Sequence, residues 1–244
     1  MSLLGKRTGE MHLALTADAE GPDFVPEPFS LLYQRSVYQS MRNLTMRVTQ
    51  LLRSNMKKLP EDIRGDAADI LSYEQEIMKV FQKIFQKKIS SMKTRFHGDY
   101  HLGQALFTGN DFIIIDFEGE PDRTISERRH KRSPVRDIAG MIRSFHYAIF
   151  NALLKHASVR PEDIAVLEPW TELWYCYVSG IFLESYMKTA ENAVFMPGER
   201  EETGILLEVF LLEKAVYELG YELNNRPDWL VIPIRGIKQI LRKT

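Results

Sequence analysis

Two stretches decide the fold: His97-Gly98-Asp99-Tyr100-His101-Leu102-Gly103-Gln104, and the apolar run Phe112-Ile113-Ile114-Ile115 that leads into Asp116-Phe117-Glu118. β-Branched and aromatic residues favour a strand, and this run follows the turn-forming residues Gly109-Asn110-Asp111. The shorter segment 104–107 supplies a partner strand on the other side of that turn. We therefore expect a small β-hairpin with polar residues where its strands begin and end.

Three of these polar residues form a pattern typical of phosphoryl transfer. A carboxylate such as Asp99 can position and deprotonate an attacking hydroxyl, while the carboxylate of Asp116 and the side-chain carbonyl of Gln104 can hold Mg²⁺ against nucleotide phosphates. In the protein-kinase pattern the catalytic Asp and the metal-binding amide have this same spacing, although the amide there is Asn. An apolar strand that ends in charge needs a reason for that charge, because desolvating an unpaired carboxylate is costly. Metal coordination is such a reason.

The neighbouring residues receive supporting roles. We expect His97 to order the catalytic loop through hydrogen bonds, since phosphoryl transfer asks little covalent chemistry of the protein. His101 is assigned to substrate binding. Glu118 can coordinate the metal, hold a metal-bound water or pair with an arginine, and the last two roles rank higher than the first.

Other readings of the same segment stay open. An H-x-D-x-H string alone is an equally good match to a loop whose His and Asp residues cap backbone groups. A metal-dependent hydrolase could use His97, Asp99, His101 and Asp116 as ligands, because first-row metals accept mixed imidazole and carboxylate sets. A third alternative is a non-catalytic carbohydrate-binding module.

Helical patterns surround the hairpin and predict a mainly α-helical chain. Apolar residues recur at helical spacing, and Ser133-Pro134 supplies a helix start. We expect helices over about 4–15, about 41–59 with Pro60 closing the helix, about 66–85, 134–153, about 169–188, about 202–219 ending at Gly220, and a short helix after Pro233. The first two long helices after the connector at 21–28 should pack as a hairpin. This pattern favours one α-rich lobe over a doubly wound sheet.

Composition narrows the class of protein further. With 32 basic and 33 acidic residues, the 244-residue chain has a formal charge of -1, which gives no electrostatic argument for nucleic acid or an anionic membrane. The single Cys176 cannot form an internal disulfide. No apolar run is long enough to span a bilayer, so we expect a soluble cytoplasmic protein. Residues 1–3 precede what reads as the middle of a helix, so we expect a cloning-derived start on a longer chain.

Five segments together resemble the maltokinases of the aminoglycoside-phosphotransferase-like kinase group, and the resemblance covers most of the chain. These segments are LGKRTGEMHLAL at 4–15, HGDYHLGQ at 97–104, IIDFEGEP at 114–121, SPVRDIAGM at 133–141 with RSF at 143–145, and LEKAVYELGYE at 212–222. Jointly they are far more specific than any one motif.

The resemblance implies a protein-kinase-like C-terminal lobe that phosphorylates maltose to maltose 1-phosphate with ATP. Asp99 would be the catalytic base, and Gln104 and Asp116 would hold Mg²⁺. Maltokinases are often fused to a trehalose synthase. Kinases of this group also carry an N-terminal lobe that clamps ATP, and we expect the chain 1–244 to be the C-terminal lobe alone, with no ATP-clamping residues of its own and little or no activity in isolation.

Two aromatic clusters are candidates for the sugar pocket. The region matching Tyr217, Tyr221 and Trp229 contributes to the maltose pocket in the resembled family, and rings of this kind pack against sugar C–H faces. The second cluster, Trp170, Trp174, Tyr175 and Tyr177, reads as an aromatic core stripe. The basic run at 128–132 is interpreted as a solvated loop, and Arg136 and Asp137 as structural supports.

Overall fold

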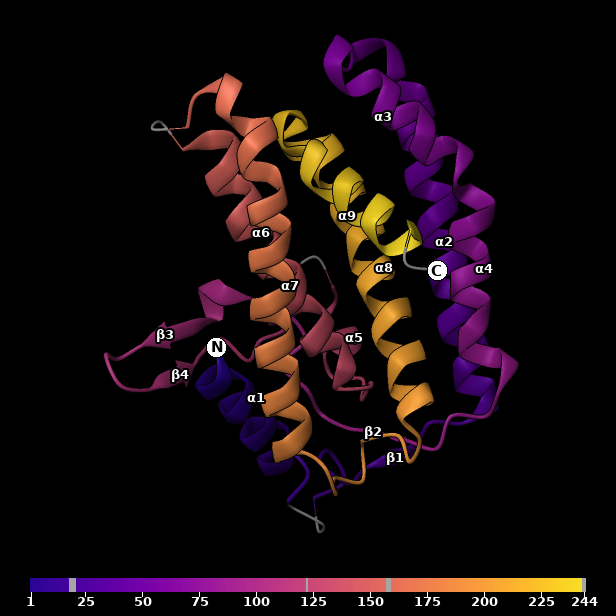
Figure 1. The fold of residues 1–244 in the computed structure, drawn as a ribbon. Helices are drawn as coiled ribbons and strands as arrows, with labels where there is room; N and C mark the ends of the chain where they lie inside the picture. The colour runs from indigo at the N-terminus through magenta and orange to yellow at the C-terminus, as the bar shows by residue number, and fades with distance from the viewer. Residues whose placement is uncertain (18–20, 122, 157–158, 243–244) are drawn as a thin grey trace. The chain divides into compact units, whose positions relative to one another are not determined.

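The computed structural model describes residues 1–17, 21–121, 123–156 and 159–242, and most of them are helical (Figure 1). The chain forms two compact units. Unit 1 comprises Met1–Phe29 and Ser90–Glu199, and unit 2 comprises Ser30–Ile89 and Arg200–Thr244. The mainly helical class predicted from the sequence is confirmed. Within the described residues no helix is both long and apolar enough to cross a membrane.

Unit 1 carries the β-hairpin and the helices that support it. Its elements are α1 (Ser2–Ala14), β1 (Glu27–Pro28), β2 (Met92–Lys93), a 3-10 turn (Leu102–Gln104), β3 (Ala105–Phe107), β4 (Phe112–Ile114), α5 (Ile125–Arg128), α6 (Val135–Lys155), a second 3-10 turn (Pro161–Asp163) and α7 (Ile164–Thr189). β3 and β4 are antiparallel, with Ala105 opposite Ile114 and Phe107 opposite Phe112. The predicted hairpin is therefore confirmed.

The second strand of the hairpin ends earlier than expected. β4 stops at Ile114, and Asp116 has a backbone φ of 64°. Left-handed backbone is costly for a residue with a Cβ atom and is incompatible with strand pairing. Asp116 therefore lies in a bend that leaves the hairpin.

α1 packs closely against α7 because two glycines face that helix. A Cβ atom on Gly5 would lie 2.2 Å from the Phe182 carbonyl oxygen, and one on Gly9 would lie 2.8 Å from Thr189 Cβ. The side chains that α1 buries follow the same side of the helix: Leu4, Thr8 and His12 are each fully buried. This close approach lets polar side chains of α1 reach the interior of unit 1.

Unit 2 is helical throughout. Its elements are α2 (Leu31–Asn55), a 3-10 turn (Met56–Lys58), α3 (Glu61–Ser72), α4 (Glu74–Gln86), α8 (Arg200–Asn225), a 3-10 turn (Pro227–Trp229) and α9 (Val231–Arg242). Gln34 near the start of α2 bonds to the Lys87 carbonyl just after α4, at 2.8 Å, and Arg53 near its end bonds to Glu74 at the start of α4, at 2.6 Å. The predicted packing of this region as an antiparallel hairpin is confirmed.

Several predicted helix boundaries in the chain are wrong. α2 begins at Leu31, ten residues before the expected start, and α9 begins at Val231 and includes Pro233. The segment expected as one helix over 66–85 is interrupted at Tyr73, because α3 packs against α9 while α4 packs mainly against α2 and α8. α8 continues through Gly220 because this glycine lies against α2, where an added Cβ would meet Val48 Cγ2 at 2.8 Å. α7 begins before Pro169, whose missing N–H affects only the exposed carbonyl of Ala165.

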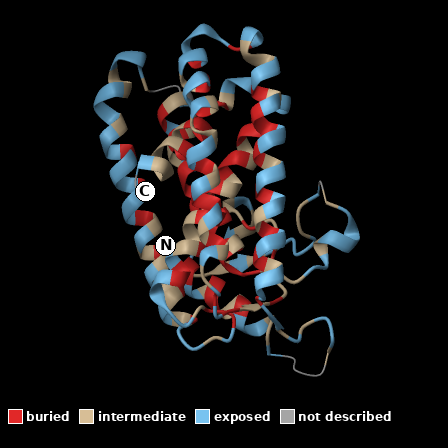
Figure 2. Cartoon of the chain, turned by 90° about the vertical axis from the view of Figure 1, so that its right-hand side faces the viewer, coloured by how far each residue is buried: buried red, intermediate tan, exposed pale blue. Residues whose placement is uncertain are grey.

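The apolar residues predicted for the helix after Ser133-Pro134 form part of the core. Val135, Ile138 and Phe145 of α6 are almost completely buried, and Phe145 meets Phe182 of α7 with ring centroids 5.4 Å apart. Figure 2 shows buried positions following one side of the long helices and exposed positions following the other. The apolar spacing of α6 therefore matches the face of the helix that enters the core of unit 1.

Candidate active site

The loop that holds Asp99 is fixed by the carboxylate of Asp137 on α6. Asp137 Oδ2 accepts the His97 backbone N–H at 2.7 Å, and Oδ1 accepts the Gly98 N–H at 3.0 Å. Asp137 is only 2% exposed. Gly98 has a φ of 90°, a conformation that residues with a Cβ atom rarely adopt. The buried carboxylate thus holds the loop in a tight path directly before Asp99.

Two further positions of α6 touch the same loop. A Cβ atom on Gly140 would lie 2.7 Å from the Tyr100 carbonyl oxygen, so only glycine allows this approach. Ser144 Oγ accepts the Leu102 backbone N–H at 3.0 Å. Asp137, Gly140 and Ser144 are three and four residues apart, which places them on one face of the helix. The RDIAGMIRS segment at 136–144 therefore serves as the support of the loop.

His97 joins the loop to the segment after β4. Its Nε2–H donates to the Ile115 carbonyl at 2.8 Å, and its Nδ1 accepts the Asp99 backbone N–H at 3.4 Å. Its ring also lies 4.9 Å from the Phe117 ring, between centroids. The ordering role predicted for His97 agrees with these contacts. They bond the segment that contains Asp99 to the segment that contains Asp116.

Gln104 and Asp116 have side chains directed at each other. Gln104 Nε2 donates to Asp116 Oδ2 at 2.8 Å. The backbone carbonyl of Gln104 accepts the Ile115 backbone N–H at 3.0 Å. Among the described residues Asp116 alone combines a side chain with a positive φ, which is a strained conformation often found at functional sites. A carboxylate and an amide that share one point fit Mg²⁺, because rotation of the amide would present its oxygen there.

The remaining predicted site residues of unit 1 lie on the same two segments. Asp99 has a partly exposed side chain, and His101 Nε2 lies 3.9 Å from its Oδ2. His101 Nδ1 accepts the Gly103 N–H at 3.1 Å. Glu118 is exposed and forms no hydrogen bond or ion pair with any described residue, so among its three expected roles the pairing with an arginine has no support in this part of the chain.

The hydrolase alternative finds little support in this geometry. Both nitrogens of His97 are engaged by backbone groups, which leaves no lone pair of that ring free to bind a metal. Within the described residues no three His, Cys, Asp or Glu side chains gather as a metal site. The candidate site suits an oxygen-ligated ion better than zinc.

The predicted sugar-binding aromatics belong to unit 2. Tyr217 and Tyr221 lie on α8 with nearly parallel rings, whose centroids are 6.5 Å apart. The Lys214 ammonium lies 4.9 Å from the Tyr217 ring centroid, and the Arg226 guanidinium lies 4.7 Å from that of Trp229. These rings are therefore partly covered by cationic side chains. Their assignment to the sugar pocket stays a prediction.

The second aromatic cluster is not the core stripe expected from its spacing. Tyr175 is buried, but Trp170 and Tyr177 are 67% and 69% exposed, and Trp174 is 40% exposed. α7 buries a narrower stripe made by Thr171, Tyr175, Val178, Phe182 and Tyr186. The apolar residues of α7 outnumber the positions that this stripe can bury.

The basic run at 128–132 is only partly a solvated loop. Lys131 bonds to Glu27 at 3.2 Å and to the Pro22 carbonyl at 2.7 Å, and just 8% of its side chain is exposed. Arg128 donates to the Pro121 carbonyl at 2.7 Å. Arg129 and His130 are exposed as expected. The prediction is wrong for Lys131 and Arg128, because both side chains form hydrogen bonds with other connecting segments of unit 1.

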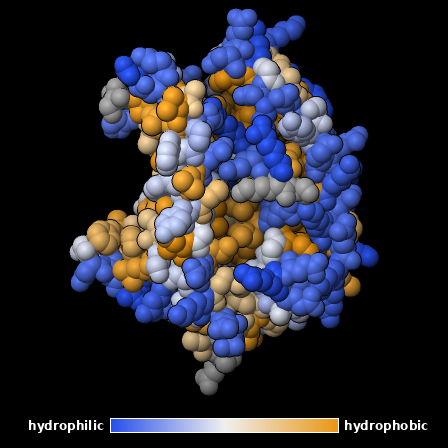
Figure 3. Space-filling model, viewed as in Figure 1, coloured by the Kyte–Doolittle hydropathy of each residue, from blue (hydrophilic) through white to orange (hydrophobic). Residues whose placement is uncertain are grey.

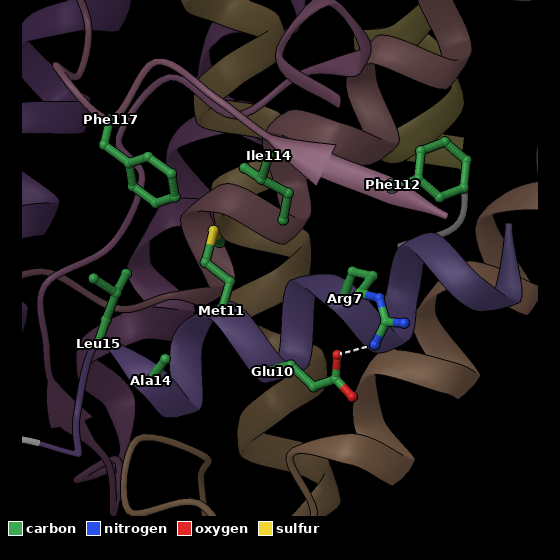
Figure 4. A pocket seen from close by; sticks show the side chains of 8 residues that line it. All are labelled: Arg7, Glu10, Met11, Ala14, Leu15, Phe112, Ile114 and Phe117. Atoms are coloured by element: carbon green, nitrogen blue, oxygen red, sulfur yellow. Dashed lines mark hydrogen bonds and ion pairs between the residues drawn. The ribbon is translucent and has the colours of Figure 1, made fainter. Parts of the chain in front are cut away.

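An apolar cavity of about 410 Å³ lies between α1 and the hairpin (Figure 4). Met11, Ile114 and Phe117 point into it, and Arg7 pairs with Glu10 at its edge. Arg7 also bonds to both carboxylate oxygens of Asp111 beside the hairpin turn, at 2.7 and 2.8 Å. In the space-filling view, hydrophobic surface covers the hairpin (Figure 3), where Leu106, Phe107 and Ile113 are at least half exposed.

Comparison with known proteins assigns the fold. No protein-family model matches this chain. A glucosamine kinase of Mycolicibacterium smegmatis is 24% identical over 146 residues, which are 59% of this chain and 34% of that protein. A glucosamine kinase of Streptacidiphilus jiangxiensis is 22% identical over 145 residues, which are 59% of this chain and 31% of that protein.

Solved structures of glucosamine kinase match nearly the whole chain. Crystal form A superimposes with a TM-score of 0.72 at 19% identity and covers 99% of this chain and 53% of that chain. A complex of glucosamine kinase with glucosamine, ADP and inorganic phosphate superimposes with a TM-score of 0.71 at 19% identity. This match covers 99% of this chain and 54% of that chain. The chain thus spans about half the length of these structures. Over that half it shares the fold of the glucosamine kinase structures.

Proposed function

We propose that this chain is the acceptor- and metal-binding half of an ATP-dependent sugar kinase. The observation that carries the proposal is the bond between His97 Nε2 and the Ile115 carbonyl, because it joins the segments that contain Asp99 and Asp116. Phosphoryl transfer needs a positioned base and a metal-binding carboxylate held in fixed relation to each other. The likeness in fold to glucosamine kinase supports the same class of reaction.

Asp99 has the role of the base. Its carboxylate would accept the proton of a sugar hydroxyl while that oxygen attacks the γ-phosphorus of ATP and ADP departs. Gln104 and Asp116 are the residues that would hold Mg²⁺, which neutralises negative charge on the phosphates. His97 Nδ1 accepts the Asp99 backbone N–H, which ties the backbone of the proposed base to the His97 ring. Glu118 is exposed beside Asp116 and would hold a metal-bound water.

The acceptor is a small sugar, and two identities are supported by different observations. Maltose, giving maltose 1-phosphate, follows from the resemblance of the five sequence segments to maltokinases. Glucosamine follows from the ligand of the solved relative. Of the two, we favour glucosamine, because the glucosamine kinases match by sequence and by fold. His101 of unit 1 is a proposed sugar-binding residue, and Tyr217, Tyr221 and Trp229 of unit 2 are separate candidates for sugar contact. Placement in the cytoplasm and fusion to a trehalose synthase domain remain predictions.

The decisive experiment measures ADP formation by the full-length gene product with glucosamine, maltose and glucose as separate acceptors. We expect turnover that depends on both Mg²⁺ and sugar, and Asp99→Asn should lower kcat by about 100-fold to 10,000-fold, as loss of a general base does. Phosphorus NMR of the product identifies the phosphorylated oxygen, since an anomeric phosphate couples to the H1 proton.

Asp111→Asn is the matched control, because Asp111 lies on the same hairpin and bonds to Arg7 instead of facing Gln104. It should keep nearly normal kcat. Sugar-independent ATP hydrolysis, or turnover that survives Asp99→Asn unchanged, would refute the proposed reaction. Sugar binding without any turnover would favour the carbohydrate-binding module.

A further inference from the structure

His12 of α1 lies behind the candidate catalytic loop and has no part in the chemistry described above. Its side chain is fully buried, and both ring nitrogens have polar partners. Nε2 lies 3.0 Å from Asp137 Oδ2, and Nδ1 lies 3.0 Å from the Tyr186 hydroxyl. The Tyr186 and Phe195 rings meet the imidazole edge-on, at centroid distances of 5.6 and 5.9 Å. Contacts on its nitrogens and on its ring thus fix the orientation of His12.

The partners of His12 are complementary to one arrangement of its hydrogens. A carboxylate accepts hydrogen bonds, and an Nε2–H of His12 is placed to donate to Asp137. The tautomer that carries its hydrogen on Nε2 leaves Nδ1 as an acceptor, to which the Tyr186 hydroxyl can donate. Burial, together with the nearby charge of Asp137, raises the pKa of Tyr186 well above its ordinary value, which keeps this donor protonated. The contacts therefore form a continuous chain from Tyr186 through His12 to Asp137.

Three N–H groups converge on the Asp137 carboxylate. Oδ2 accepts from His12 and from the His97 backbone, and Oδ1 accepts from the Gly98 backbone. Without His12, Oδ2 would lose one of its two hydrogen bonds in a buried environment, where each bond has more weight than in water. The carboxylate could then rotate away from the loop. The position of the loop therefore depends on a residue that does not touch it directly.

Other residues of α1 support the contact between His12 and Asp137. One turn before His12, Thr8 Oγ1 lies 2.8 Å from the Tyr100 hydroxyl, so the helix reaches the loop region at two levels. Gly5 and Gly9 bring α1 against α7, the helix that contributes Tyr186. The LGKRTGEMHLAL segment at 4–15 thus combines two small residues facing α7 with two buried polar residues, of which Thr8 contacts Tyr100 and His12 contacts Asp137.

We propose that His12 is a positioning residue for the catalytic loop. It fixes the Asp137 carboxylate, which in turn holds the backbone of His97 and Gly98 and so the position of Asp99. The structural part of this inference is independent of the reaction, and only its kinetic consequence rests on the proposed function.

Amide hydrogen exchange, followed residue by residue by NMR, tests the structural part in the 244-residue chain. His12→Leu replaces the imidazole with an apolar side chain of similar bulk and so removes both hydrogen bonds. We expect the His97 and Gly98 amides to exchange at least about tenfold faster in this variant, after correction for the change in global stability, because loss of one charge-assisted hydrogen bond has an effect of that size. His12→Gln can place an N–H near the position of Nε2 and should restore most of the protection.

Leu153→Ala is the matched control for destabilisation alone. Leu153 is a buried residue of α6, 16 positions beyond Asp137, so its loss weakens the same unit away from the loop. After the same correction it should leave the His97 and Gly98 amides unchanged. Equal acceleration in His12→Leu and Leu153→Ala would show that His12 is only a core residue and would overturn the proposal, as would failure of His12→Gln to protect the two amides better than His12→Leu.

Kinetics of the full-length protein separate this inference from the proposed function. If both hold, His12→Leu lowers kcat about tenfold or more with little change in the KM for ATP, and His12→Gln recovers it. If the protein phosphorylates no sugar while the exchange pattern appears as expected, the function is wrong and the positioning role stands. Unchanged kcat in an active full-length His12→Leu variant would overturn the positioning role.

Discussion

Gln104 Nε2 donates a 2.8 Å hydrogen bond to Asp116 Oδ2, across the base of a hairpin whose last paired residues are Ala105 and Ile114. The two side chains are thus directed at one point by their own hydrogen bond. Such preorganisation lowers the conformational entropy that a ligand must remove on binding. It also predicts which positions of the hairpin respond to a divalent cation.

Asp116→Asn should weaken binding of Mn²⁺, a paramagnetic substitute for Mg²⁺, by at least about tenfold, since even loss of an outer-shell group costs that much. In the unchanged protein Mn²⁺ should broaden the NMR signals of Gln104 and Asp116 most strongly. Asp111→Asn removes a carboxylate from the same hairpin and should leave the broadening in place. Equal weakening in both variants would show that the ion responds only to the charge of the hairpin.

The contact of α1 with α7 predicts opposite effects for two glycine substitutions. Gly5→Ala places a Cβ 2.2 Å from the Phe182 carbonyl oxygen and should lower the free energy of unfolding by about 1–3 kcal/mol, as overpacking does. Gly65→Ala lies in an exposed position of α3 with nothing within 4 Å and should raise it by about 0.5–1 kcal/mol. Urea denaturation measures both. A stabilising Gly5→Ala would contradict the close approach of the two helices.

A surface ion pair in unit 1 should make stability depend on acidic pH. Hydrogen bonds from Lys93, and then from Lys131, hold the pKa of Glu27 below its ordinary value. A lowered folded-state pKa means that the unfolded chain binds the proton more tightly, so this stabilisation is present above the unfolded pKa and is lost as pH falls through the folded pKa. In Glu27→Gln the stability curve should fall less steeply below about pH 4.3. An unchanged curve would show that solvent screens the pair completely.

The hairpin and α6 could be predicted from the sequence because their signals are local. An apolar β-branched run after a turn specifies a strand, and Ser133-Pro134 specifies a helix start, whatever lies around them. The pairing of Gln104 with Asp116 also follows from local spacing across a short turn. Two helix boundaries that were predicted wrongly depend on packing partners that are distant in sequence. Gly220 ends no helix because α2 packs onto it, and Tyr73 interrupts a continuous apolar stripe because its two halves face different helices.

The support of the catalytic loop was only partly predictable, for the same reason. Asp137 was expected to be a structural support, but its partners at 97 and 98 lie about 40 positions earlier in the chain. His12 gave no signal of its own, since a single histidine in a helix has no characteristic spacing. One clue was present: Thr8 and His12 are polar residues on the face of α1 that also contains Leu4. Polar residues on an apolar helix face indicate a buried hydrogen-bond network.

Asp137→Asn should be among the most destabilising single changes in unit 1. The amide keeps one acceptor oxygen, but its NH₂ group must face either the Gly98 N–H, or the His97 N–H together with His12 Nε2, so donors oppose each other in a buried site. Loss of a buried charge partner costs about 3 kcal/mol, so the midpoint of urea denaturation should fall clearly. Asp163→Asn makes the same chemical change in an exposed ion pair with Arg160 and should have a much smaller effect.

His12→Leu combined with Asp137→Asn should destabilise the protein by less than the sum of the two separate losses, because both variants remove the same hydrogen bond. Additive losses would mean that the His12–Asp137 contact contributes nothing to the stability of the folded state.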